Sequence, residues 1–145
     1  MPGSLLSLNK PMKQIIDFLN ANPVQFLATV GLDGKPKVRP FQFMLEDSGK
    51  LWFCTGNKKE VYAELQKQPY IELSASSTDN AWLRLSARVI FENNLVIKRK
   101  IIKQNDLVRS IYKSGDNPDF EVFYITDGNA AITDFSGNPP RVFTI

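Results

Sequence analysis

The sequence predicts a mainly β protein with short α-helices, folded as a closed or nearly closed barrel of six or seven antiparallel strands. Short runs of alternating apolar and polar residues predict the strands, because successive side chains of a strand point to opposite faces. Clusters of Gly, Asp, Asn and Ser between these runs predict turns. The 145 residues include 10 Phe, 4 Tyr and 2 Trp, which is enough aromatic bulk for a folded core. We expect residues 12–145 to form one domain and residues 1–11 to be an N-terminal tail.

The N-terminal half is expected to contain one helix and then three strands. Met12, Ile15, Ile16 and Leu19 recur at helical spacing, and the pattern ends near Asn22-Pro23. The expected strands cover residues 24–30, 35–45 and 51–55, with turns at residues 31–34 and 46–50. We expect the second and third strands to pair as a hairpin that leads into a helix over residues 62–68, and the first strand to extend this hairpin into a meander.

The C-terminal half is expected to combine strands with two helices. Strands are predicted over residues 70–75 and 82–91, and helices over residues 94–103 and 106–113. Asp127-Gly128-Asn129 predicts the turn of a final hairpin between residues 121–126 and 130–135. Along residues 82–91 one face is apolar, and the other face carries Trp82, Arg84, Ser86 and Arg88. This second face is either a solvated sheet surface or a wall that faces a ligand or a partner chain.

The composition argues against several functional classes. The net charge of +3 comes from 18 basic and 15 acidic side chains that are interspersed, so nucleic-acid binding is not indicated. The chain has no histidine, which removes histidine-based triads and histidine-ligated zinc, and we expect no metal site. Cys54 is the single cysteine, which excludes an internal disulfide and predicts a reducing, cytoplasmic location. No apolar run is long enough to span a membrane.

Residues 55–59, Thr-Gly-Asn-Lys-Lys, separate the third expected strand from the helix that follows, and they predict an anion site. A helix N-terminus presents unpaired backbone N–H groups and partial positive charge, so a phosphate placed there gains several hydrogen bonds. Thr55 and Asn57 add short polar side chains, and Lys58 and Lys59 add formal charge. The alternative is that Asn57 only caps the helix and the two lysines form a solvated first turn.

With its elements in this order, the chain resembles the small FMN-binding split-barrel proteins related to pyridoxamine 5′-phosphate oxidase. The resemblance covers nearly all of residues 12–143. It is carried by the blocks FLATVGLDGKPKVRPF, LWFCTGNKKEVYAELQKQPYIELSA, WLRLSARVIF and EVFYITDGNAAITDFSGNPP. The resemblance implies a six-stranded antiparallel Greek-key split β-barrel, a homodimer, and one flavin mononucleotide (FMN) in each of two clefts at the subunit interface.

The resemblance also implies which residues contact the cofactor. They are Arg39, Pro40, Phe41, Gln42, Thr55, Asn57, Lys58, Lys59 and Trp82. The arginine would reach the flavin phosphate, and the three residues after it would run beside the isoalloxazine ring. Thr55, Asn57 and the two lysines would cradle the phosphate. Trp82 would form part of the cleft wall, from the same subunit or from its partner.

For function, the resemblance implies an FMN-dependent oxidoreductase whose substrate and catalytic residues stay open. Relatives that oxidise pyridoxamine 5′-phosphate close the substrate pocket with a C-terminal Arg and His, whereas this chain has no histidine and its last arginine is Arg141. We therefore expect poor turnover of pyridoxamine phosphate, and a flatter substrate such as a quinone, a nitro-aromatic or a free flavin. The alternatives are a non-catalytic module that binds or stores flavin or another ligand, and a structural barrel dimer without cofactor.

Overall fold

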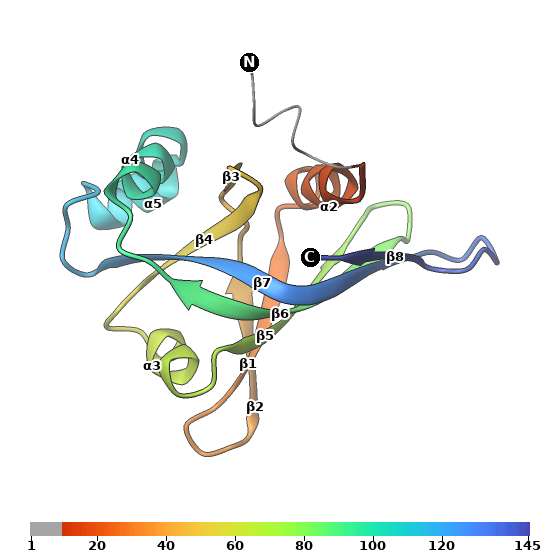
Figure 1. The fold of residues 1–145 in the computed structure, drawn as a ribbon, viewed down its shortest axis with the longest axis horizontal. Helices are drawn as coiled ribbons and strands as arrows, with labels where there is room; N and C mark the ends of the chain where they lie inside the picture. Colours follow the sequence, from red (N-terminus) through yellow and green to blue (C-terminus); the bar gives the residue numbers. More distant parts are fainter. Residues whose placement is uncertain (1–9) are drawn as a thin grey trace.

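The computed structural model describes residues 10–145 (Figure 1). Its helices are α2 (Lys10–Ala21), α3 (Glu60–Lys67), α4 (Leu95–Gln104) and α5 (Asp106–Tyr112). Its strands are β1 (Gln25–Val30), β2 (Pro36–Phe41), β3 (Leu45–Asp47), β4 (Lys50–Gly56), β5 (Tyr70–Ser76), β6 (Trp82–Phe91), β7 (Phe120–Thr133) and β8 (Arg141–Thr144). The expected N-terminal tail falls mainly on residues 1–9, which lie outside the described residues, and Lys10 and Pro11 already belong to α2.

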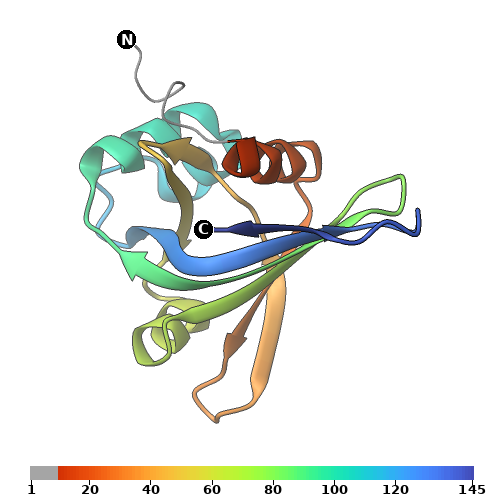
Figure 2. The ribbon, with the colours of Figure 1, turned by 45° about the vertical axis from the view of Figure 1, so that its right-hand side comes forward.

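The strands form one strongly bent antiparallel sheet, which confirms the predicted split-barrel class. Their order is β2-β1-β5-β6-β7-β4-β3, and β8 pairs with β7. β2 and the short strand β3 are the two ends of this order, and β2 pairs with neither β3 nor β4, so the barrel is open on this side. Because β3 covers only the first residues of β4, the rest of β4 borders the opening. In Figures 1 and 2, β1 and β2 cross β6 and β7 at a steep angle, as the bend requires. The described residues contain eight strands rather than six, because the short strands β3 and β8 add pairings beside β4 and β7.

The predicted hairpin between residues 35–45 and 51–55 forms only at its tip, where the three-residue strand β3 pairs with the start of β4. The rest of the prediction is wrong, because β2 pairs with β1. The fully buried side chain of Gln25 explains the break between β2 and β3: its Oε1 accepts a hydrogen bond from the Phe43 N–H at 2.8 Å, and its Nε2 donates to Leu19 O at 3.0 Å. The Phe43 amide is thus bonded to a side chain instead of a neighbouring strand, and the backbone leaves the sheet edge here.

The predicted hairpin around Asp127-Gly128-Asn129 is also wrong, because β7 continues through it as one strand of 14 residues. Asp127 has a φ of 52°, and the register shift places it and Gly128 opposite Ala87 alone, which is a β-bulge. A Cβ atom at Gly128 would overlap the backbone oxygen of Ser86, so glycine allows the two strands to approach. The C-terminal hairpin joins β7 to β8 instead.

Two apolar clusters pack on opposite sides of β4. Leu51 and Phe53 point into the barrel, where the buried residues of α2 and α3 join them. Trp52 points to the other side, into a second cluster with the buried residues of α4 and α5. Fully buried Phe53 stacks on Phe123 of β7 with 5.4 Å between ring centroids. This arrangement places α5 beside the end of β4, next to the open side of the barrel.

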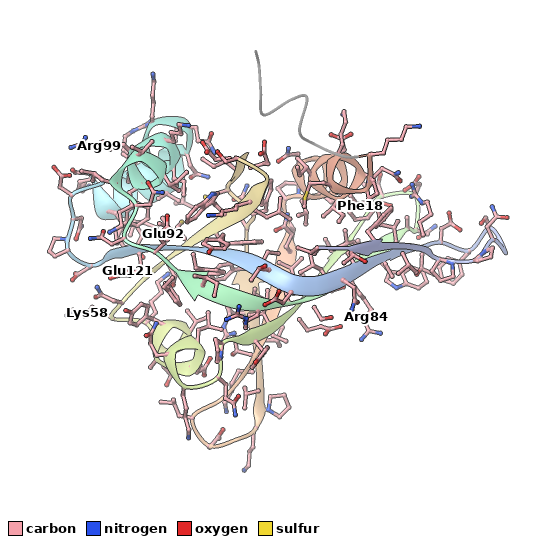
Figure 3. All side chains as sticks on the ribbon, in the orientation of Figure 1. Phe18, Lys58, Arg84, Glu92, Arg99 and Glu121 are labelled. Atoms are coloured by element: carbon pink, nitrogen blue, oxygen red, sulfur yellow. The ribbon has the colours of Figure 1, made fainter. Side chains whose placement is uncertain are left out.

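A third surface, the outer sheet face, lies on the side of β1, β2, β5 and β6 that points away from the barrel interior. Its exposed apolar side chains include Phe26, Val38 and Tyr70. Its charged side chains include Arg84, whose Nη2 lies 3.0 Å from Glu72 Oε1. Arg84 points away from α2 in Figure 3.

Within residues 10–145, no helix is long and apolar enough to cross a membrane.

Candidate functional site

A cavity of about 380 Å³, here called the split cavity, lies at the open side of the barrel between β2 and β4. The start of α3 and one side of α5 complete its walls. The predicted cofactor contacts that line it are Arg39, Pro40, Phe41, Gln42, Thr55 and Lys59. The fold therefore brings six predicted residues from two separate segments around one cavity of a size typical for small-molecule sites.

One end of the split cavity is polar and cationic. Thr55 is 3% exposed, and its Oγ1 has no hydrogen-bond partner among the described residues. Lys59 occupies the N-cap position of α3, where no side chain caps the helix. Its ammonium group makes no ion pair within residues 10–145. An unpaired hydroxyl, an uncapped helix N-terminus and a cation without a counter-ion all favour an anionic ligand group.

Arg39 lines the split cavity but is already held by buried groups. Its Nη2 donates to Glu64 Oε1 at 2.6 Å, and its Nη1 donates to Thr29 Oγ1 at 2.8 Å. The Thr29 hydroxyl in turn donates to Glu64 Oε1 at 2.7 Å. Because the Glu64 side chain is only 3% exposed, its carboxylate neutralises Arg39 in a region where water screens little. Arg39 is therefore a positioned donor, and only its remaining N–H groups can serve a ligand.

Asn57 and Lys58 lie beside the split cavity and do not line it. The Asn57 Nδ2 donates to Pro118 O and to Glu121 Oε2, both at 2.8 Å, so this side chain ties the turn before α3 to the segment that enters β7. The alternative interpretation of Asn57 as the helix cap is wrong, because Lys59 occupies the N-cap position of α3. Lys58 is 80% exposed, lies 4.0 Å from Asp119 Oδ1, and projects from the edge of the molecule in Figure 3.

Trp82 lies on the outer sheet face and does not line the split cavity of its own chain. It borders a separate cavity of about 390 Å³ together with Glu72, Arg84 and Asn129. Its ring packs against the exposed Phe135 with 5.3 Å between centroids. The predicted contact between Trp82 and a cofactor would therefore require a second copy of the chain.

The apolar wall contributed by α5 was not predicted from the sequence. Leu107 and Ile111 line the mouth of the cavity and are 68% and 53% exposed, while Val108 and Tyr112 line it from buried positions. Leu107 and Ile111 are four residues apart, as are Val108 and Tyr112. At about 100° per residue, these four side chains form one broad apolar face, and part of it stays exposed at the cavity. The breadth of this face in a short helix is the available sequence signal, although it does not reveal what the face packs against.

Cys54 lines the split cavity as a partly buried thiol. Burial raises the pKa of Cys54 to about 12, and the positive charge of Lys59 only partly opposes this rise. The thiol is therefore protonated at neutral pH and is a poor nucleophile, because thiolates are the reactive form. Its place in an apolar strand agrees with packing as a small hydrophobic residue.

The open barrel, with a cavity at its open side, defines the class of split-barrel proteins. Residues 11–126 match the pyridoxamine 5′-phosphate oxidase family. The chain belongs to this family. A comparison with curated proteins found no match. Within residues 10–145, no group of three or more Cys, Asp or Glu residues is placed to hold a metal ion.

Solved structures share the fold over almost the whole chain. A NimC/NimA family protein from Clostridium acetobutylicum is 29% identical, with a TM-score of 0.86 over 94% of this chain and 93% of that one. A pyridoxamine 5′-phosphate oxidase-related, FMN-binding protein from Nostoc punctiforme is 17% identical, with a TM-score of 0.74 over 94% and 90%. A heme-binding protein from Mycobacterium smegmatis is 16% identical, with a TM-score of 0.73 over 94% of this chain and 59% of that one.

Proposed function

We propose that the protein binds FMN in the split cavity, with the phosphate at the N-terminus of α3. The observation that carries this proposal is the buried Thr55 Oγ1, which has no partner among the described residues. A buried hydroxyl without a hydrogen bond is costly, so a ligand acceptor at this point is favoured. The uncapped helix and the unpaired Lys59 favour an anionic acceptor. Family membership and the FMN binding of the Nostoc punctiforme protein support a flavin as the ligand.

The remainder of the split cavity suits the isoalloxazine ring. Phe41 and Gln42 line it from the end of β2, and Leu107 and Ile111 line it from α5. These side chains would hold the ring in place and exclude water from its faces. A bound flavin supplies hydride or electron transfer, so the protein needs to provide binding and orientation more than a nucleophile. We therefore assign the protein as an FMN-dependent oxidoreductase.

A second candidate function is a non-catalytic module that binds or stores flavin. The observation that favours it is that the described residues lining the split cavity include no aspartate or glutamate. The titratable side chains there are Arg39, Cys54, Lys59 and Tyr112. Burial raises the pKa of Cys54 and of Tyr112, so neither is a base at neutral pH. A reaction that requires a general base is disfavoured, whereas direct transfer at the flavin is not.

We propose a flat, weakly charged substrate such as a quinone, a nitro-aromatic compound or a free flavin. A phosphorylated substrate would need a second set of cationic partners over the ring, because burying an unpaired phosphate is costly. Arg141 is not such a partner, since its Nη1 donates to Gln14 Oε1 at 2.9 Å and it does not line the split cavity. Poor turnover of pyridoxamine phosphate is therefore part of the proposal.

We propose a homodimer in which a second copy covers the outer sheet face. A two-fold interface must be complementary to itself, and this face carries apolar Phe26 and Val38 together with paired charges of both signs. Pro40, which lines the split cavity, is the register partner of Phe26, so the cavity borders this face. The partner's Trp82 would then lie close enough to contribute to the cleft.

The single cysteine supports a cytoplasmic location for this dimer.

The test is the visible spectrum of the purified protein, followed by reduction under anaerobic conditions. FMN binding predicts a protein that carries the visible absorption of flavin or acquires it when FMN is added. An oxidoreductase predicts that NADH or NADPH bleaches this absorption and that a quinone or nitro-aromatic acceptor restores it rapidly. A bound flavin that neither nucleotide reduces would favour the storage module. A protein that stays colourless with added FMN would refute the proposed function.

A further inference from the structure

Gly56, the last residue of β4, leaves room for the hydroxyl oxygen of Tyr112. A Cβ at this position would lie 2.5 Å from the Tyr112 Oη. The backbone of Gly56 does not have a positive φ, so its conformation is open to any residue. The close approach of the tyrosine hydroxyl is therefore the reason for glycine here. The Gly56 carbonyl also accepts the Lys59 N–H at 3.1 Å, which places this contact at the start of α3.

Tyr112, the last residue of α5, is held in one position by its neighbours. Its ring packs on Phe120 with 4.8 Å between centroids, and its backbone oxygen accepts a hydrogen bond from Asn117 Nδ2 at 2.8 Å. The residue is 8% exposed and lines the split cavity. Its hydroxyl makes no hydrogen bond within residues 10–145. Thr55 Oγ1 is the one fully buried side-chain polar atom without a partner among the described residues, so the Tyr112 oxygen is not sealed in the core. It is accessible from the split cavity, where a ligand acceptor can reach it.

We propose that the Tyr112 hydroxyl donates a hydrogen bond to the phosphate of the bound ligand, which makes α5 part of the phosphate site. The inference rests on the proposed function, because it needs a phosphate at the start of α3. Tyr112, Thr55 and Lys59 line the same cavity from α5, from β4 and from the N-cap position of α3. Burial and the nearby acidic groups of Cys54 and Asp119 raise the pKa of Tyr112, so its oxygen keeps the proton at neutral pH.

The test compares the affinities of Tyr112→Phe and wild type for FMN and for riboflavin, which lacks the phosphate, by calorimetric titration. One charge-assisted hydrogen bond predicts FMN binding about tenfold weaker in Tyr112→Phe, with riboflavin binding within about twofold of wild type. Gly56→Ala keeps the hydroxyl but displaces it, so it should weaken FMN in the same selective way. Tyr62→Phe is the matched control, because Tyr62 packs on Phe91 outside the split cavity and its variant should bind both flavins as wild type does.

The outcomes separate this inference from the proposed function. Selective loss of FMN affinity in both Tyr112→Phe and Gly56→Ala supports the phosphate contact. Unchanged FMN affinity in Tyr112→Phe, or equal losses for FMN and riboflavin, overturns it while the proposed function stands. Thermal melting of each ligand-free variant shows whether an equal loss comes from a disturbed fold. Failure of the wild-type protein to bind either flavin refutes the proposed function, and the inference is overturned with it.

Discussion

Two adjacent lysines that look equivalent in the sequence have different surroundings. Lys59 lines the split cavity without an ion pair among the described residues, whereas Lys58 faces solvent near Asp119. We predict that Lys59→Ala weakens FMN binding about tenfold at low salt while riboflavin binding is unchanged, because a cation at the phosphate is lost. Lys58→Ala, the matched control, should change FMN binding by less than about twofold.

Fluorescence titration with both flavins measures this difference. The Lys59 effect should shrink as salt is added, because ions screen an exposed charge. Equal effects of the two substitutions would contradict the assignment of Lys59 as the phosphate ligand.

The ion pair between Arg39 and Glu64 predicts a stability effect. Glu64→Ala would leave a partly buried guanidinium without its carboxylate and Thr29 without its acceptor. We expect a loss of about 3 kcal/mol in the free energy of unfolding, measured by urea denaturation. Glu72→Ala removes the carboxylate of an exposed pair with Arg84 and should cost less than about 1 kcal/mol. A loss for Glu64→Ala no larger than this control would show that the buried pair does not hold Arg39.

At the scale of elements, the bulge in β7 predicts that Gly128 is indispensable for pairing with β6. Gly128→Ala would drive a Cβ into the backbone of Ser86, and we expect it to lower the free energy of unfolding by about 2–3 kcal/mol. Gly49→Asn is the control, because Gly49 has a φ of 79° with open space around it and asparagine tolerates this conformation. Its effect should stay below about 1 kcal/mol, and a similar effect of both changes would contradict the bulge.

Elements with strong local signals were predicted well from the sequence. The alternation along β6 identified its buried face, since Leu83, Leu85, Ala87 and Val89 are all buried. The breaks in the sheet were not predictable, because they depend on contacts between distant residues. The Gln25 side chain that bonds the Phe43 amide is 18 residues away in sequence. An Asp-Gly pair is compatible both with a hairpin turn and with a β-bulge. The sequence pattern predicted the hairpin turn, whereas β7 contains the bulge.

In the candidate site too, residues with a local sequence signal were predicted, and contacts between distant residues were not. Arg39, Thr55 and Lys59 were predicted from local charge and from resemblance, and the fold brings them to one cavity. Tyr112 and the other α5 residues were missed, because the apolar pattern of this helix does not reveal that it packs beside the end of β4. The neutralisation of Arg39 by Glu64 was missed for a similar reason, since the two residues are 25 positions apart.

At the scale of the whole molecule, the proposed dimer predicts a selective response to charge on the outer sheet face. Val38→Glu should dissociate the dimer and weaken FMN binding, because it places a carboxylate in an apolar contact. Val96→Glu introduces the same charge at a similarly exposed position on α4 and should leave the dimer intact; Val38 and Val96 are 67% and 63% exposed. Light scattering on size-exclusion fractions measures the mass. A wild-type monomer that still binds FMN tightly would contradict the shared site.

The central claim is that the split cavity recognises a flavin through its phosphate. The most direct measurement is calorimetric titration of the wild-type protein with FMN and with riboflavin under identical conditions. The buried Thr55 hydroxyl, the uncapped start of α3 and Lys59 predict FMN binding at least about tenfold tighter than riboflavin. Equal affinities for the two flavins, or no binding of either one, would contradict the claim.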